Sequence, residues 1–357
     1  MKHDKPQHNS GWEEFHLGAL TDRIQDFTRN GEPVDLIFAQ QLTRPYCETL
    51  FELANTIRKI AKTKAGLDWL QTVLSDKRSM LFFLQPSTRT FLSFLNACHV
   101  LGIKTSEIRN AETSSEVKGE SPEDTIRTFS SYVDMVIIRH REEGYAERSA
   151  WVLNRSRRPV PVINGGSGKD EHPTQALLDL YTLHRSFKHR GGIDGKTVVM
   201  VGDLHRGRTV RSLAQLLAQY QGIHLHFVAP QQFQIRKDIL DFLDAKRVPY
   251  TLHDQLDPVV PQADAIYLTR IQDEYDTKGE SRDIDYSRYH LEARHLGVLK
   301  EDAVIMHPFP RRREIDVAAD TDPRAMYWKQ QRNGMWVRSA LIARLFGRDG
   351  TILNHVE

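Results

Sequence analysis

The chain has 357 residues, which corresponds to about two domains of ordinary size. Its composition, 39% hydrophobic and 27% charged, is typical of globular proteins and argues against a disordered or fibrous chain. The 49 basic residues stand against 47 acidic ones and are spread along the sequence, which argues against a nucleic acid partner.

Four further classes are disfavoured by simple features. Two cysteines, Cys47 and Cys98, are too few for a disulfide framework or a four-cysteine zinc site. No apolar run approaches the roughly 20 residues of a membrane span, and residues 1–15 lack the apolar stretch of a signal peptide. We therefore expect a soluble, cytoplasmic protein that binds no membrane and no metal.

The first half of the chain alternates strand and helix signals after a polar start. We interpret residues 1–35 as an N-terminal extension outside the main fold. Short continuous apolar runs predict buried strands at 80–84, 135–138 and 160–163. Apolar residues at three- and four-residue spacing predict helices at 46–60, 91–101, 147–154 and 173–187.

A charged, glycine-rich segment at 189–195 indicates a domain hinge, after which the alternation restarts. Strands are expected at 197–201, 224–228, 265–268 and 303–306, and helices at 209–220, 235–246 and 334–346. Strands separated by helix-length segments imply parallel sheets covered by helices. We predict an α/β protein with domains at 36–189 and 190–333. Its C-terminal helix, within 334–357, should pack back on the first domain, because its apolar stripe needs a buried partner.

Polar segments follow the predicted strands at the places where open parallel sheets bind ligands. In Ser87-Thr88-Arg89-Thr90, three hydroxyls and a guanidinium meet the start of a helix, which suits a phosphate dianion. An ordinary helix cap beside a surface arginine is the competing interpretation. Arg139-His140 directly follows the strand at 135–138, and a solvated strand end is the alternative there.

The third segment is Gly165-Gly166-Ser167-Gly168, followed by Glu171 to Gln175. Glycines let the backbone approach a ligand closely, and Pro173 suits the first turn of a helix. His172 would lie at the positive end of that helix, which disfavours the imidazolium form. We expect a neutral His172 that can donate to a carbonyl oxygen.

The fourth segment, 202–209, nearly matches the phosphate loop of nucleotide triphosphatases. Arg208 stands where that pattern requires lysine, which weakens the match. A nucleotide triphosphatase is nevertheless the alternative function.

Taken together, these segments resemble the aspartate and ornithine carbamoyltransferase family, in the family's own order. The likeness spans Phe83 to Arg311 and is carried by Ser87-Thr88-Arg89-Thr90, Ser114 with Lys118-Gly119-Glu120, Arg139-His140, His172 to Gln175, 201–204 with 207–210, 269–272 and 306–311. The His307-Pro308-Phe309-Pro310 motif, with Arg270 and Gln272, is similar to the members that use aspartate, whereas ornithine-using members usually carry His-Cys-Leu-Pro. Gln85 and Phe91 depart from a glutamate and an arginine usual in the family.

The resemblance implies transfer of the carbamoyl group of carbamoyl phosphate to L-aspartate in pyrimidine synthesis, without a cofactor. It implies catalytic roles for Thr88, Arg89, Arg139 and His172. Carbamoyl phosphate would also contact Ser87, Thr90, Gln175, Pro308, Phe309 and Pro310. Aspartate would be bound by Lys118, Arg208, Arg270 and Gln272.

The family's assembly adds further expectations. Ser114 and Lys118, on the loop 110–121, would be donated by a neighbouring subunit within a homotrimer with shared active sites. Regulatory or pathway-enzyme subunits are further partners that the resemblance allows. Another acceptor amine such as ornithine, or a catalytically inactive structural homologue, are the alternatives, although an inactive homologue would normally have lost some of these charged residues.

Overall fold

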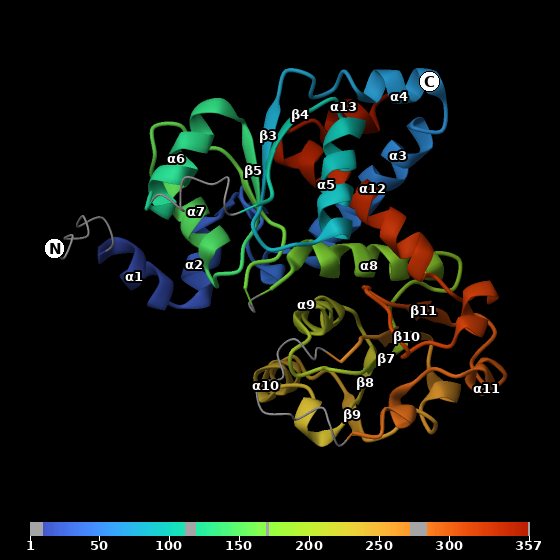
Figure 1. Ribbon diagram of the computed structural model, residues 1–357. Coiled ribbons are helices and arrows are strands. Elements are labelled where there is room, and N and C mark those ends of the chain that lie inside the picture. The colour runs from blue at the N-terminus through green and yellow to red at the C-terminus, as the bar shows by residue number, and fades with distance from the viewer. Residues whose placement is uncertain (1–9, 111–118, 169–170, 272–283, 356–357) are drawn as a thin grey trace. The chain divides into compact units, whose positions relative to one another are not determined.

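The computed structural model describes residues 10–110, 119–168, 171–271 and 284–355. It contains two compact units, each built on a parallel β-sheet with flanking helices (Figure 1). Unit 1 comprises residues 1–42, 56–173 and 339–357, and unit 2 comprises residues 43–55 and 174–338. The predicted α/β class with two domains is confirmed.

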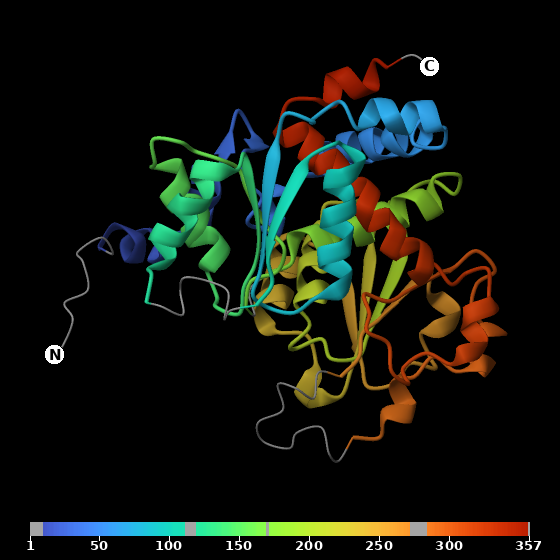
Figure 2. The ribbon, with the colours of Figure 1, turned by 45° about the horizontal axis from the view of Figure 1, so that its top comes forward.

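The sheet of unit 1 has the strand order β4-β3-β5-β6, and every pairing is parallel. The strands are β3 (Arg78–Phe83), β4 (Lys104–Ile108), β5 (Met135–Arg139) and β6 (Val162–Asn164). Figure 2 shows α5 (Thr88–Val100) on one face of this sheet and α6 (Pro122–Tyr132) and α7 (Tyr145–Asn154) on the other. Side chains of β3 and β5 such as Phe82, Val136 and Ile138 fill the core beneath α6 and α7.

The N-terminal segment is part of this core, so the expectation that it lies outside the main fold is wrong for residues 10–35. It forms α1 (Ser10–Leu17), α2 (Leu20–Asp26) and a two-stranded hairpin of β1 (Thr28–Arg29) and β2 (Glu32–Pro33). Trp12 is buried with its ring 5.9 Å from that of Trp151 on α7, and Phe27 is fully buried beside Phe38. A few well-spaced aromatic side chains thus anchor a segment whose overall composition is polar.

A buried ion pair also holds the N-terminal helices on α7. Arg23 donates from Nε and Nη2 to the two oxygens of Glu147, at 2.6 Å each, and the Nδ1 atom of His16 lies 3.0 Å from Glu147 Oε2. The Glu147 side chain is only 3% exposed. Because the carboxylate is buried, Arg23 matters more to stability than an arginine in an exposed pair does.

We expect Arg23→Ala to lower the free energy of unfolding by roughly 2–3 kcal/mol, since the buried Glu147 carboxylate then loses two guanidinium hydrogen bonds and is left beside the half-exposed His16. Urea unfolding followed by circular dichroism measures the change. Lys237→Ala is the matched control, because Lys237 and Asp241 form an exposed pair within one helix, for which about 0.5 kcal/mol or less is expected. Equal effects of the two substitutions would contradict the assignment.

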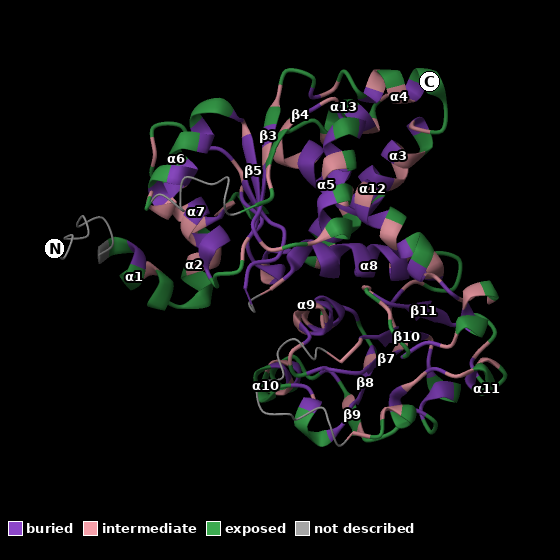
Figure 3. Cartoon of the chain, in the orientation of Figure 1, coloured by how far each residue is buried: buried purple, intermediate pink, exposed green. Residues whose placement is uncertain are grey.

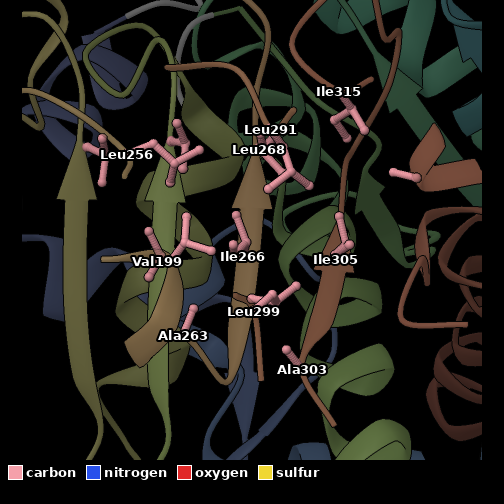
Figure 4. Close-up of a cluster of buried hydrophobic side chains, with 14 of the residues drawn as sticks. Val199, Leu256, Ala263, Ile266, Leu268, Leu291, Leu299, Ala303, Ile305 and Ile315 are labelled. Atoms are coloured by element: carbon pink, nitrogen blue, oxygen red, sulfur yellow. The ribbon is translucent and has the colours of Figure 1, made fainter. Parts of the chain in front are cut away.

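The sheet of unit 2 has the order β11-β10-β7-β8-β9, again with parallel pairings throughout. The strands are β7 (Thr197–Val201), β8 (His224–Val228), β9 (Tyr250–His253), β10 (Ala265–Leu268) and β11 (Val304–Met306), and the shorter helices are α9 (Arg208–Leu217), α10 (Lys237–Ala245) and α11 (Ala293–Leu296). Alternate residues of a strand face the same side of a sheet. Figure 4 shows Val199, Ile266, Leu268 and Ile305 meeting the side chains of the segments that cover one face, including Leu256, Leu291 and Ile315.

Two long helices complete unit 2 together with the first part of α3 (Arg44–Ile60). They are α8 (Pro173–Phe187) and the first part of α12 (Tyr327–Leu345). Tyr181 on α8 donates to Asn55 Oδ1 at 2.9 Å, and Asn333 donates to Thr182 Oγ1 at 3.0 Å. These bonds explain why α8 groups with unit 2, so that the compact units divide at 173–174 and not at the predicted boundary of 189–190.

The end of the chain belongs to unit 1, as predicted for the C-terminal helix. The hydroxyl of Ser339, in the second part of α12, donates to the carbonyl of Ala97 at 3.4 Å. Beyond α13 (Asp349–Leu353), the ring of His355 stacks at 3.6 Å on Trp69 of α4 (Lys64–Leu70). The helix begins at Tyr327, seven residues earlier than position 334, since Gly334 does not interrupt it.

Burial differs between the two edges of each sheet (Figure 3). The strands β5, β6, β10 and β11 are buried at every residue, whereas β4 and β9, which lie at the opposite edges, contain no buried residue. In the part of the chain that the structure describes, helices fall short of the length and apolar character that crossing a membrane requires.

Candidate active site

Three of the sequence-predicted segments lie at one edge of the unit 1 sheet. They follow β3, β5 and β6, which are neighbours in the order β3-β5-β6, so their carboxyl ends lie side by side. Ser87 is the N-cap of α5, yet among the described residues its hydroxyl makes no capping hydrogen bond. The ordinary helix-cap interpretation is therefore not supported. Thr88 and Arg89 are exposed in the first turn of α5, and Thr90 is buried.

Arg139, Gly166 and His172 are brought together at this edge. Arg139 ends β5, is 9% exposed, and donates from Nη1 to the carbonyl of Gly165 at 3.0 Å. Gly166 has φ +107°, and a Cβ atom there would lie 2.4 Å from Arg139 Nη1 and 3.2 Å from His172 Cδ2. His172 is 4% exposed and directly precedes α8. A guanidinium and an imidazole thus flank one glycine, whose missing side chain leaves them room.

The two departures from the family pattern have local structural partners. Phe91 packs its ring edge-on against Phe83, at 5.5 Å, and the guanidinium carbon of Arg109 lies 4.2 Å from the centroid of the Phe91 ring. This is the geometry of a cation–π contact. The backbone N–H of Gln85 donates to the carbonyl of Arg139 at 3.2 Å, which ties the β3 loop to the end of β5.

The remaining predicted segments lie at the corresponding edge of the unit 2 sheet. They follow β11, β10 and β7, which are adjacent in that order. Arg208 is the first residue of α9, and Arg270 is the second residue after β10, where its Nη1 donates to the carbonyl of Ile271 at 3.2 Å. Gly202 has φ +115°, and a Cβ atom there would lie 2.1 Å from the carbonyl oxygen of Thr269. The loops that carry the two arginines therefore touch through their backbones.

The segment 307–310 is held by a buried histidine. The backbone N–H of Phe309 donates to His307 Nδ1 at 2.8 Å, so the ring proton is on Nε2, which donates to Glu314 Oε1 at 2.7 Å. Phe309 has φ +59°, and the peptide bond to Pro310 is cis. These contacts fix the backbone that carries the carbonyl groups of Pro308 and Phe309.

A polar cluster around Gln175 was not predicted from the sequence. Gln175 Nε2 donates to Asp179 Oδ1 at 2.9 Å, Gln330 Nε2 donates to the same oxygen at 2.6 Å, and Tyr267 Oη donates to Asp179 Oδ2 at 2.7 Å. Burial raises the pKa of Asp179 to about 7, although these hydrogen bonds oppose the rise. The i, i+4 spacing of Gln175 and Asp179 on one predicted helix was the available signal.

The predicted site residues are divided between the two units. Unit 1 holds Ser87, Thr88, Arg89, Thr90, Arg139 and His172, and unit 2 holds Gln175, Arg208, Arg270, Pro308, Phe309 and Pro310. Ser114, Lys118 and Gln272 lie outside the described residues.

Comparison with known proteins identifies the family. Residues 35–185 match the profile of the aspartate/ornithine carbamoyltransferase carbamoyl-P binding domain, and residues 194–345 match that of the Asp/Orn binding domain. The chain belongs to the aspartate/ornithine carbamoyltransferase family. The segment 202–209 lies inside the second profile, so its likeness to a phosphate loop is part of the carbamoyltransferase pattern.

Individual members of the family are similar over most of the chain. The chloroplastic aspartate carbamoyltransferase of Arabidopsis thaliana is 41% identical over 315 residues, which are 87% of this chain and 77% of that protein. The catalytic subunit of the Thermoplasma acidophilum enzyme is 39% identical over 84% of this chain and 93% of its own. The crystal structure of the Trypanosoma cruzi aspartate transcarbamoylase in complex with carbamoyl phosphate has a TM-score of 0.78 at 34% identity, covering 87% of this chain and 95% of that chain.

Proposed function

We propose that this chain transfers the carbamoyl group of carbamoyl phosphate to the amino group of L-aspartate, giving N-carbamoyl-L-aspartate and phosphate. The observation that carries the proposal is the meeting of Arg139, Gly166 and His172 at the end of β5, on a chain with both family domains. The related Trypanosoma cruzi enzyme has been crystallised with carbamoyl phosphate and aspartate.

The chemistry requires no enzyme nucleophile. The amine of aspartate attacks the carbamoyl carbon, negative charge develops on the carbonyl oxygen, and the C–O bond to phosphate breaks. Arg139, His172 and Thr88 are the donors to the developing oxyanion, and the loss of one such donor typically lowers turnover about 10²–10³-fold. Ser87, Arg89 and Thr90 hold the phosphate at the start of α5, where helix N–H groups also favour an anion. The departing phosphate accepts the amine proton.

The positive charge of two arginines favours aspartate as the substrate that accepts the carbamoyl group. Arg208 and Arg270 lie on the segments that follow the neighbouring strands β7 and β10. They suit the two carboxylates of aspartate, because guanidinium and carboxylate pair in a two-pronged geometry. Ornithine would present an ammonium group to one of these arginines instead. Gln272 supports this acceptor role, as the family resemblance implies.

An acceptor panel tests the function. With carbamoyl phosphate present, aspartate, ornithine and glutamate are offered separately, and carbamoylated product and phosphate are measured. ATP with Mg²⁺ is offered without carbamoyl phosphate, and phosphate is measured. We expect transfer to aspartate at least about 100-fold faster than to ornithine, because ornithine would place its ammonium group beside a guanidinium and leave that arginine without a carboxylate partner. Equal use of ornithine, phosphate release from ATP alone, or no transfer at all would each overturn the proposal.

We further propose a homotrimer in which Ser114 and Lys118 enter the site of a neighbouring subunit. The family resemblance supports this, and the polar loop 110–121 with Gly119 in it suits a segment that extends away from its own sheet. Mutually complementing variants then follow. Lys118→Ala lacks the donated cation but keeps Arg89, and Arg89→Ala lacks the resident phosphate ligand but keeps Lys118.

We expect activity to reappear when these two inactive variants are dissociated together and reassembled, because some interfaces pair an intact resident site with an intact donated loop. Activity of the mixture is measured against each variant reassembled alone, and a size measurement establishes the mixed trimer. Mixed trimers that remain inactive would show that each site is built within one chain.

Pathway partners are the last part of the proposal. The Squalus acanthias multifunctional protein CAD contains a region 38% identical to this chain, which corresponds to 13% of that protein. The same catalytic unit is thus found within a larger polypeptide, which supports association of this chain with other enzymes of pyrimidine synthesis.

A further inference from the structure

Asp179 is a buried carboxylate that receives every hydrogen bond given above for it from a neutral donor. It lies on α8 and is fully buried, and its partners come from three elements: Gln175 on α8, Tyr267 on β10 and Gln330 on α12. All four residues belong to unit 2. A buried guanidinium, that of Arg338, favours the ionised form of Asp179. Buried polar groups of this kind are strongly specified by their partners.

The carboxylate decides which way the Gln175 amide faces. In the structure the NH₂ end of Gln175 points to Asp179, so its Oε1 points away. When Asp179 is ionised it can only accept hydrogen bonds, which favours this orientation of the amide. The Gln330 amide is oriented in the same way. Its Nε2 donates to Asp179, and its Oε1 accepts a hydrogen bond from the backbone N–H of His307 at 3.0 Å. The backbone N–H of His307 can only donate, so the orientation of Gln330 is fixed, and the orientation of Gln175 is set by its bond to Asp179.

The Asp179 carboxylate is thus connected by hydrogen bonds to two predicted ligands of the carbamoyl group. Gln175 is one of them, and the backbone after β11 is the other, through Gln330 and His307. The NH₂ of the carbamoyl group donates hydrogen bonds, so the atoms that bind it must be acceptors such as oxygen. A Gln175 amide turned the other way would present its own NH₂ to the substrate and its oxygen to Asp179.

We propose that Asp179 is a positioning residue that holds Gln175 with Oε1 towards the substrate, so that the site selects an acyl donor with an NH₂ group over one with a methyl group. The inference rests on the proposed carbamoyl transfer and adds a residue that sets donor specificity. Asp179 itself touches neither substrate.

The test compares two stable ligands that differ only at that group. Phosphonoacetamide and 2-oxopropylphosphonate share the phosphonate and the carbonyl, and one carries NH₂ where the other carries CH₃. Their dissociation constants are measured by calorimetry with the full-length protein and with Asp179→Leu, which is similar in volume but cannot accept a hydrogen bond. We expect the preference for phosphonoacetamide to fall about tenfold, the typical value of one hydrogen bond, with little change in the affinity for 2-oxopropylphosphonate.

Two further variants separate this role from general packing. Tyr267→Phe removes another hydrogen bond to the same carboxylate but leaves the one to Gln175, so the preference should stay at the wild-type value. Asp179→Asn keeps an oxygen that can accept from both glutamines, and it should restore the preference. If Asp179→Leu does not fold, Asp179→Ala, which leaves space for water, carries the same prediction, and the asparagine variant is still required to keep the preference.

The outcomes distinguish this inference from the proposed function. A wild-type protein that transfers no carbamoyl group to aspartate would refute the function, whatever the variants do. A wild-type protein that is active, with a folded leucine or alanine variant that keeps the full preference, would refute the role of Asp179 alone. So would equal weakening of both phosphonates, or loss of the preference in Asp179→Asn.

Discussion

Replacing Arg139 by alanine should lower kcat about 10²–10³-fold, the usual effect of losing a donor to a developing oxyanion. The KM for carbamoyl phosphate should change much less, because the contact to the carbonyl oxygen strengthens only as negative charge forms there. Steady-state kinetics with both substrates varied measures the two parameters.

The matched control for this experiment is Arg141→Ala. Arg141 is an exposed arginine two residues further along the chain, and its loss should leave both parameters near the wild-type values. A variant of Arg139 with intact kcat and a raised KM would show that Arg139 serves ground-state binding only.

Replacing Gly166 by alanine should lower kcat about 10²-fold, although the glycine has no functional group of its own. The added Cβ would lie 2.4 Å from Arg139 Nη1, so the guanidinium must move and its bond to the Gly165 carbonyl is lost. A displacement of about 1 Å at a reacting centre is enough for an effect of this size. Kinetics and thermal unfolding of the same variant separate activity from stability.

Gly31→Ala is the control for backbone strain. Gly31 also has a positive φ, +78°, but a Cβ atom there meets nothing within 4 Å. Both alanine variants should lose about 1 kcal/mol or more of stability from the strained backbone, and only Gly166→Ala should lose activity. Equal kinetic effects of the two variants would refute the steric explanation.

The buried strands could be predicted from the sequence because they satisfy a simple condition. A central strand of a parallel sheet has apolar neighbours on both faces, so it reads as a continuous apolar run. The predicted bounds of β7, β8 and β10 agree with the structure at both ends. The same condition explains two omissions. The edge strands β4, with the sequence KTSEI, and β9, with YTLH, contain no buried residue, and no apolar run marks them.

The N-terminal segment shows a second limit of composition. Its average is polar, but Trp12 and Phe27 are buried, and Arg23 finds a buried carboxylate 124 residues away. Long-range pairing of this kind leaves no periodic signal in the sequence. A few buried side chains hold the segment on unit 1. Their signal is lost when hydrophobicity is averaged over a polar stretch of sequence.

The candidate site was predictable to the extent that it lies on loops after strands. Arg139 ends β5, Arg270 is the second residue after β10, and Arg208 begins the helix that follows β7, so hydrophobic runs locate all three positions well. The buried hydrogen bonds that hold the site residues in place could not be predicted in the same way. Gln330 lies 151 residues from Asp179, and nothing in its local sequence distinguishes it from a surface glutamine on a polar helix face.

The path of the chain between the two units has a consequence for how such a protein can evolve. The polypeptide changes unit at 42–43, 55–56, 173–174 and 338–339, and three of these changes occur within the continuous helices α3, α8 and α12. Neither unit is therefore one uninterrupted stretch of gene. A single recombination event cannot exchange one substrate-binding half for that of a relative, because four joints would have to match at once. New acceptor specificities are expected to arise by point substitutions in the loops after β7, β10 and β11, with the two halves inherited together.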